Sequence, residues 1–284
     1  MHTRARNMLG ERCLRGWLIR VGIDSKNMGY CAPVFPDGTF EFIPLPAFGR
    51  TDETKTYGTM EARNKRYGEH LSDFIHTDPR ELYDGKGNLV ISSYDFENGE
   101  LLSPKDIPMH YDPEFETSTF GDQWMGAGQD NRGRIPSDLH PGNYVFFYSG
   151  LMKYDPAFYQ SERKWDSFRE FRRYNMCTYI IGYLKVRDII SIETVEDLHS
   201  RPEMTNNAHV KEEIIPSVIL IGDESRLLTK AIPMNSWDDK TRKYVPTKLG
   251  MNILHLQPLS GVRVWKWLEE PDCEAVLELI HENQ

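Results

Sequence analysis

Short runs of apolar and aromatic residues, separated by turn-forming residues, recur along the chain and predict strands more often than helices. The clearest runs cover 18–24, 143–150, 179–186, 217–222 and 261–267. The Asp37-Gly38 pair predicts a tight hairpin turn, because glycine accepts the positive φ that such turns need. Near the end, Val276, Leu277 and Ile280 share a helical stripe and predict a closing helix over 272–281.

This order of elements predicts an α+β protein without clean βαβ alternation. We expect a curved, mainly antiparallel sheet or a β-barrel, with packed helices. At 284 residues the chain can bury a substantial core. We expect one domain over 18–267, in which 18–120 and 140–267 share a core. Residues 1–17 form a basic tail and 268–284 hold the C-terminal helix.

Charge and cysteine content narrow the class of protein. The net charge of −9 argues against a general nucleic-acid coat protein but leaves room for a local basic surface. Four scattered cysteines without a CxxC motif, and no apolar run long enough to span a membrane, predict a cytoplasmic protein with reduced thiols. The arginine-rich start has two explanations, a basic tail or an early start codon.

The strongest indication of a chemical site comes from two similar strings, His76-Thr77-Asp78-Pro79 and His110-Tyr111-Asp112-Pro113. In an extended chain, residues i and i+2 face the same side, so each string presents an imidazole beside a carboxylate. If the strings converge, their four groups suit metal binding or acid–base work. Asp-Pro also begins helices, and Glu81 favours that reading for the first string. We favour function for the second string and assign no metal site.

Three further segments have a functional and a structural reading. The turn Asp24-Ser25-Lys26 is either an anion site or an Asx turn. Arg226 either lies at a site off a strand end or pairs within a helix that Asp223 caps. His209 lies in a polar loop without an identifiable partner.

The basic, aromatic segment 161–175 either contacts nucleic acid or forms an amphipathic helix. Familiar catalytic motifs are absent from the sequence: HExxH, GxSxG, GxGxxG and the zinc-deaminase pattern. Common hydrolase, dinucleotide-binding and zinc-deaminase functions therefore lack support.

Several strings in consistent order resemble the third type of nucleotide modification associated domain. They are the opening strand into Asp24-Ser25 with Phe35-Pro36-Asp37-Gly38, His110-x-Asp112-Pro113, Thr119-Phe120-Gly121-Asp122, the run 141–148, Ile181-Gly182-Tyr183-Leu184 and Ser225-Arg226-Leu227-Leu228. The resemblance spans about residues 18–267. It implies association with enzymes that make or manage modified nucleotides in phage and prokaryotic conflict systems, without an agreed reaction. Asn143 departs from the acidic residue expected after Pro-Gly.

A looser resemblance links the second half to PUA-like modules, including the ASCH and EVE types. These are small bent β-barrels that bind nucleic acid or modified bases. By this analogy, Tyr148, Trp165 and Arg169 are candidates to hold a base. Fold analogy does not by itself fix function.

These observations lead to a nucleotide- or nucleic-acid-directed protein of a DNA-modification system. A base or nucleotide would bind in a cleft lined by the Asp24-Ser25 turn, His110, Asp112, Asp122 and Tyr148. In an enzyme, His110 is the expected general base, oriented by Asp112 or Asp122.

Arg226 or Lys26 would meet a phosphate. The alternative is a non-catalytic reader of modified nucleic acid that uses a PUA-like barrel and segment 161–175. DNA-modification enzymes are the expected protein partners, and the sequence identifies no cofactor and no oligomeric state.

Overall fold

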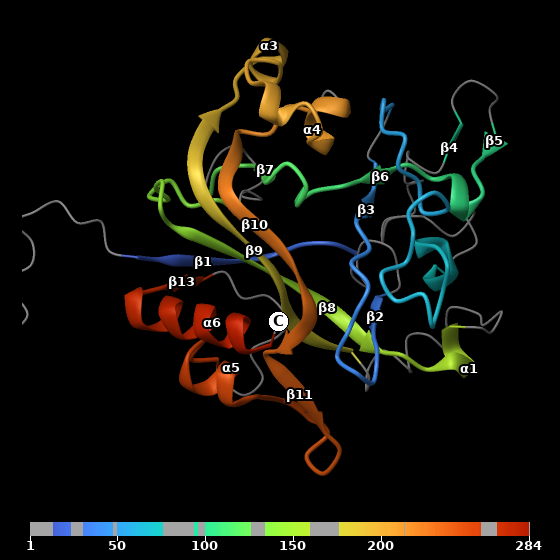
Figure 1. Cartoon of the computed structure of the whole chain (residues 1–284), viewed down its shortest axis with the longest axis vertical. Coiled ribbons are helices and arrows are strands. Elements are labelled where there is room, and N and C mark those ends of the chain that lie inside the picture. The colour runs from blue at the N-terminus through green and yellow to red at the C-terminus, as the bar shows by residue number, and fades with distance from the viewer. Residues whose placement is uncertain are drawn as a thin grey trace, which may run out of the picture.

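A strongly curled sheet organises the chain (Figure 1). The computed structural model describes residues 14–23, 31–47, 50–75, 94–95, 100–125, 134–159, 176–212, 214–256 and 266–283. Within these ranges, seven strands form one sheet: β1 (Gly16–Arg20), β2 (Ala32–Val34), β7 (Thr119–Asp122), β8 (Tyr144–Lys153), β9 (Met176–Ser191), β10 (Val218–Pro233) and β13 (Lys266–Leu268).

The strand order is β13-β1-β8-β9-β10-β7, and β2 also pairs with β8. Strands β1 and β2 run parallel to β8, whereas the other neighbouring pairs are antiparallel. The expected α+β fold with a curved, mainly antiparallel sheet is therefore confirmed. Of the two expected forms, the described strands make an open curved sheet, with β13 and β7 at its edges.

The long strands β9 and β10, of 16 residues each, explain the curl. Their pairing shifts register at three places, between Ile221 and Gly222, between Gly222 and Glu224, and between Leu227 and Ile232. Such irregularities bend a strand and increase its twist. The predicted strand 217–222 thus continues to Pro233. Both interpretations of Arg226 are wrong about its local structure, because Arg226 lies neither beyond a strand end nor on a helix. It is an exposed residue in the middle of β10 and pairs with Tyr183 on β9.

The predicted Asp37-Gly38 turn is confirmed by its hydrogen bonds. The Gly38 amide donates to the Phe35 carbonyl at 2.9 Å, and the Phe35 amide donates to the Thr39 carbonyl at 2.7 Å. Gly38 has φ +86°, which glycine adopts without strain. The turn brings Phe40 back beside Val34 in an antiparallel bridge.

One large hydrophobic cluster draws on both halves of the chain. Trp17, Phe40 and Phe120 come from the first half, and Phe146 and Val276 from the second. Each of these side chains is at most 4% exposed, so burial of aromatic surface from distant segments holds the sheet and its loops together. The domain limits 18–267 remain a prediction.

Smaller elements surround the sheet. The helices are α1 (Pro156–Tyr159), α3 (Val195–Leu198), α4 (Ala208–Lys211), α5 (Lys248–Asn252) and α6 (Glu270–Glu282), and the short strands are β3 (Leu45–Pro46), β4 (Tyr94–Asp95), β5 (Glu100–Leu101), β6 (Met109–His110), β11 (Asn235–Asp238) and β12 (Lys243–Pro246). Three 3-10 turns cover Leu71–Phe74, Pro104–Asp106 and Pro202–Met204.

The predicted closing helix is α6, which buries Cys273, Val276 and Ile280 at helical spacing. Helices α3 and α4 lie at one end of the curled strands, and α5 and α6 lie at the other (Figure 1). In the part of the chain that the structure describes, no helix has both the length and the apolar character to cross a membrane.

Candidate functional site

Two histidines and an aspartate meet where two distant segments come together. His110 ends β6, Asp112 follows two residues later, and His209 lies on α4. One ligand atom from each of these side chains lies within 4.8 Å of those of the other two. The side chains are 8%, 3% and 13% exposed, respectively. We call these three residues the His–Asp–His cluster.

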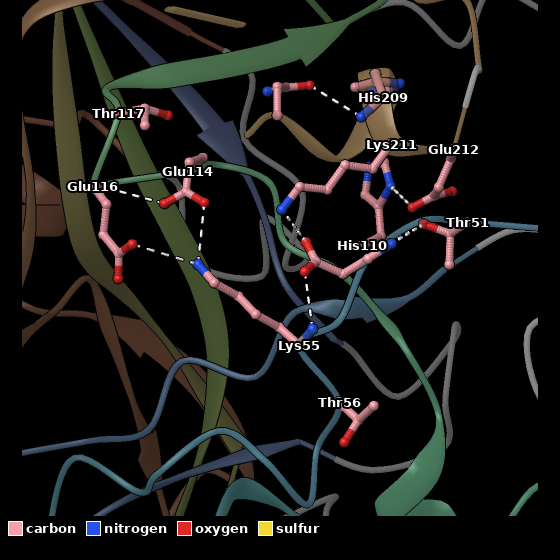
Figure 2. A network of polar contacts seen from close by, with 12 residues as sticks. Thr51, Lys55, Thr56, His110, Glu114, Glu116, Thr117, His209, Lys211 and Glu212 are labelled. Atoms are coloured by element: carbon pink, nitrogen blue, oxygen red, sulfur yellow. Dashed lines mark hydrogen bonds and ion pairs between the residues drawn. The ribbon is translucent and has the colours of Figure 1, made fainter. Parts of the chain in front are cut away.

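His110 is held by a strand on one side and a buried carboxylate on the other. Strand β6 pairs with β3, where His110 lies opposite Leu45. The Nδ1 atom of His110 lies 2.7 Å from Oε1 of Glu212, whose side chain is fully buried (Figure 2). Because a carboxylate oxygen accepts hydrogen bonds, Nδ1 of His110 is the donor in this pair. The carboxylate on His110 is therefore Glu212, where the sequence predicted Asp112 or Asp122.

Asp112 is fixed by donors from two other segments. The Gly121 amide donates to Oδ2 at 3.0 Å, and the side-chain amide of Asn207 donates to Oδ1 at 3.2 Å. Asn207 is fully buried and also donates to the hydroxyl of Thr119 at 3.2 Å. These hydrogen bonds fix the orientation of the Asp112 carboxylate. As predicted for a His-x-Asp string, both side chains reach the same place.

His209 completes the cluster from the opposite side. The side chain of Asn207 accepts a hydrogen bond from the His209 amide and caps α4 at its start. Nε2 of His209 lies 3.2 Å from the Gly121 carbonyl oxygen and 3.6 Å from Oδ2 of Asp112, the latter an ion-pair distance. The ring is perpendicular to that of His110, with centroids 4.8 Å apart.

The electrostatic environment of His209 is set by burial and by carboxylates. Burial acts to lower the pKa of His209, but Asp112, Asp122 and Glu212 together raise it above the ordinary value. Its Nδ1 atom is buried and has no hydrogen-bond partner within the described ranges. The imidazole thus has one nitrogen engaged by Gly121 and Asp112 and one still available to a ligand.

Gly121 allows this close approach. A Cβ atom added at Gly121 would lie 2.3 Å from Cδ2 of His209, far inside a normal contact. No larger residue fits there unless the imidazole moves. The backbone of β7 therefore serves both residues, since its amide holds Asp112 and its carbonyl oxygen lies against His209.

Asp122 is adjacent to the cluster but belongs to a separate ion pair. Its Oδ2 atom lies 2.6 Å from Nε of Arg134, and its backbone pairs with Val218 on β10. Burial raises the pKa of Asp122, while the Arg134 charge opposes that shift. Its role is to add negative charge beside His209, and it does not orient His110.

A chain of alternating charges flanks the cluster (Figure 2). Lys211 contacts Glu53 at 2.8 Å, and the other oxygen of Glu53 accepts a hydrogen bond from the Lys55 amide at 2.9 Å. The Lys55 ammonium lies 3.3 Å from Glu114 and 3.5 Å from Glu116. Burial raises the pKa of Glu114, an effect that the Glu116 amide and Lys55 oppose. Two partly exposed lysines thus belong to the charged network that flanks the cluster.

The other predicted site residues do not join this cluster. Tyr148 is fully buried within β8, so its side chain is not on a surface that a base can reach in this conformation. Arg226 lies on the exposed part of β10. The remaining candidates lie outside the described residues: Asp24, Ser25, Lys26, Trp165, Arg169, and the first His-x-Asp string with His76 and Asp78.

Sequence reasoning missed Glu212 and Asn207 and found no partner for His209. A signal was present in the order Asn207-x-His209-x-x-Glu212, because asparagine favours the helix N-cap position and residues three apart share a helix face. The capped turn therefore pointed to an imidazole and a carboxylate on one side of a helix.

Comparison with known families gives one clear result. The model of the family described as nucleotide modification associated domain 3 matches residues 15–275, and so confirms the family resemblance noted from the sequence. No curated protein and no solved structure matches the chain significantly. The looser likeness to PUA-like modules remains a prediction.

Proposed function

Because this chain belongs to the nucleotide modification associated domain 3 family, we propose that it is an enzyme acting on a nucleotide or on a base within nucleic acid. The reaction centre is the His–Asp–His cluster with Glu212. The observation that carries the proposal is the convergence of His110, Asp112 and His209, whose ligand atoms lie within 4.8 Å of one another.

Burial makes a purely structural role for this cluster costly. Each ionised carboxylate loses its hydration when it is buried, and good geometry only partly offsets that loss. Apolar residues of similar volume would hold β6, β7 and α4 together at least as well. Buried groups with shifted pKa values, such as His209 and Asp122, concentrate at functional sites.

The cluster offers the chemistry that nucleotide modification needs. An imidazole fixed at Nδ1 by a carboxylate presents Nε2 either as a proton acceptor or as a ligand. His110 with Glu212 has this arrangement. Lys55 and Lys211, 24% and 18% exposed, supply positive charge that a nucleotide phosphate can attract from their carboxylate partners.

The test combines substrate screening with two variants. The full-length protein is incubated with deoxynucleotides, ribonucleotides and single- and double-stranded DNA, and mass spectrometry follows base or nucleotide modification. We expect H209A and E212Q to lower turnover about 100-fold or more, in line with the loss of positioned acid–base groups. H255A is the matched control, because His255 is an exposed imidazole that lies 3.2 Å from Asp272.

Two results would overturn the proposal. One is turnover that H209A and E212Q leave unchanged. The other is a protein that binds nucleic acid without modifying it, and loses that binding only when Arg169, Arg172 and Arg173 are reversed in charge. The second result would establish the non-catalytic reader.

A further inference from the structure

We infer that His110, Asp112 and His209 form a binding site for one divalent transition-metal ion. This inference rests on the proposed function, since it names what the reaction centre holds. The sequence alone favoured no metal site, because Glu81 favoured a helix start for the string that holds His76 and Asp78. His209 changes that picture by supplying a third ligand from α4.

The geometry is close to what a metal ion requires. With metal–ligand bonds of about 2.0–2.1 Å, neighbouring ligands in a tetrahedral site lie about 3.4 Å apart. Oδ2 of Asp112 and Nε2 of His209 are already 3.6 Å apart, and the widest separation in the cluster is within 4.8 Å. Closure by about 1.4 Å at that widest point would bring the ligand atoms to tetrahedral spacing.

Outer contacts orient two of the ligands in the way that metal sites commonly use. A metal-ligating histidine donates its other ring N–H to a carboxylate or a backbone carbonyl. His110 has Glu212 at Nδ1, so Nε2 would be its ligand atom. Asp112 receives hydrogen bonds from Gly121 and Asn207, which hold its carboxylate in place.

His209 faces the other two ligands through Nε2. This atom lies 3.6 Å from Oδ2 of Asp112 and 3.2 Å from the Gly121 carbonyl oxygen. Nε2 is therefore the ligand atom of His209 in this site, and a metal ion there would replace its contact with Gly121.

The ligand set selects the class of metal. Two imidazoles and one carboxylate suit zinc, cobalt, iron or manganese, whereas calcium and magnesium prefer oxygen ligands throughout. Three protein ligands leave at least one position for water or substrate, as in catalytic and not in structural metal sites. A metal ion here would therefore take part in the reaction at the cluster.

Equilibrium metal binding tests this inference without any activity assay. Tag-free full-length protein is stripped with chelator and titrated with zinc by calorimetry and with cobalt by visible absorption. We expect one ion per chain, cobalt d–d bands, and a rise in Tm on metal addition. H209A should weaken binding about 100-fold or more, and E212Q about 10- to 100-fold through its effect on His110. H255A should bind like the wild type.

Folding of each variant is checked by circular dichroism without metal, and E212Q covers the risk that H209A misfolds. Absence of stoichiometric binding, or wild-type affinity in both variants, overturns the metal site. Turnover that persists in metal-free protein also overturns a metal at this centre but leaves the nucleotide function standing. Metal bound at the cluster, without modification of any nucleotide or nucleic acid, supports the site and removes the proposed function.

Discussion

His110 with Glu212 and His255 with Asp272 are both imidazole–carboxylate pairs, yet they have opposite environments. The first pair is separated by 2.7 Å, with side chains 8% and 0% exposed. The second is separated by 3.2 Å, with side chains 58% and 25% exposed. Residue type and contact are similar, so the difference between the pairs is essentially one of burial.

Burial changes what such a pair can do. At the surface, water screens both charges, and the pair contributes up to about 1 kcal/mol. In the interior, each partner depends on the other, because removing one leaves a buried polar group or charge unpaired. The buried pair therefore fixes a tautomer and an orientation, which is the property that a reaction centre needs. The exposed pair has no such constraint.

The largest difference in stability between the two pairs is expected when the carboxylate is removed from each. E212A removes the buried carboxylate at Nδ1 of His110 and should lower the free energy of unfolding by about 3–5 kcal/mol. The matched variant D272A should lower it by no more than about 1 kcal/mol. Urea denaturation followed by circular dichroism measures both values. Equal losses in the two variants would show that burial does not separate the pairs.

A smaller effect is expected from crowding His209. In G121A the new Cβ would lie 2.3 Å from the His209 ring, and the required shift should cost about 2–3 kcal/mol. The double variant G121A/H209A removes the obstructing ring, so it should recover part of that loss. The measurement is a double-mutant cycle on the free energy of unfolding. Additive losses would contradict the contact between these two residues.

Lysine pairs extend the comparison to positive charge. Lys211 contacts Glu53, with side chains 18% and 1% exposed, whereas Lys65 contacts Glu61, with side chains 53% and 75% exposed. We expect K211M to lower the free energy of unfolding by about 1–2 kcal/mol, because it leaves the buried Glu53 carboxylate with fewer partners. K65M should lower it by about 0.5 kcal/mol or less.

The two lysine variants are compared at low and at high salt. High salt should abolish most of the K65M effect and leave most of the K211M effect, since salt screens exposed charges more strongly. If high salt reduced both effects equally, burial would not protect the Lys211–Glu53 pair from screening.

The strands and the turn were predictable because local pattern determines them. The runs at 143–150 and 179–186 correspond to β8 and β9, and Gly38 marks the turn that the structure contains. The continuation of β10 beyond Gly222 was not predictable in this way. Residues 223–231 are mostly polar or exposed, and pairing with β9 overrides their local preference.

The site was only half predictable, for a similar reason. The spacing of His110 and Asp112 placed two side chains on one face, which a local rule can do. Their partners His209 and Glu212 lie about one hundred residues away, and only the folding of α4 against β6 and β7 brings them together. Asp122 follows the His110 string closely in the sequence, which suggested Asp122 as a partner for His110. In the structure, the Asp122 carboxylate forms an ion pair with Arg134 instead.

The last test, with the smallest expected effect, compares a buried and an exposed carboxylate by how each changes the pH dependence of stability. Burial raises the pKa of Glu41 above its ordinary 4.5, against the opposing effect of the Arg63 and Asn64 amides. The exposed carboxylate of Asp197 accepts hydrogen bonds from the Glu193 and Thr194 amides, which lower its pKa below 3.8.

A raised folded-state pKa means that the folded protein binds the proton more tightly than the unfolded chain. Relative to E41Q, the wild type should therefore lose stability as pH rises above about 4.5. A lowered pKa has the opposite sign, so relative to D197N the wild type should lose stability as pH falls below about 3.8. Urea denaturation of the three proteins, at pH values about one unit apart between about pH 3 and about pH 7, measures both trends. If both differences changed in the same direction with pH, burial would not be what distinguishes the two carboxylates.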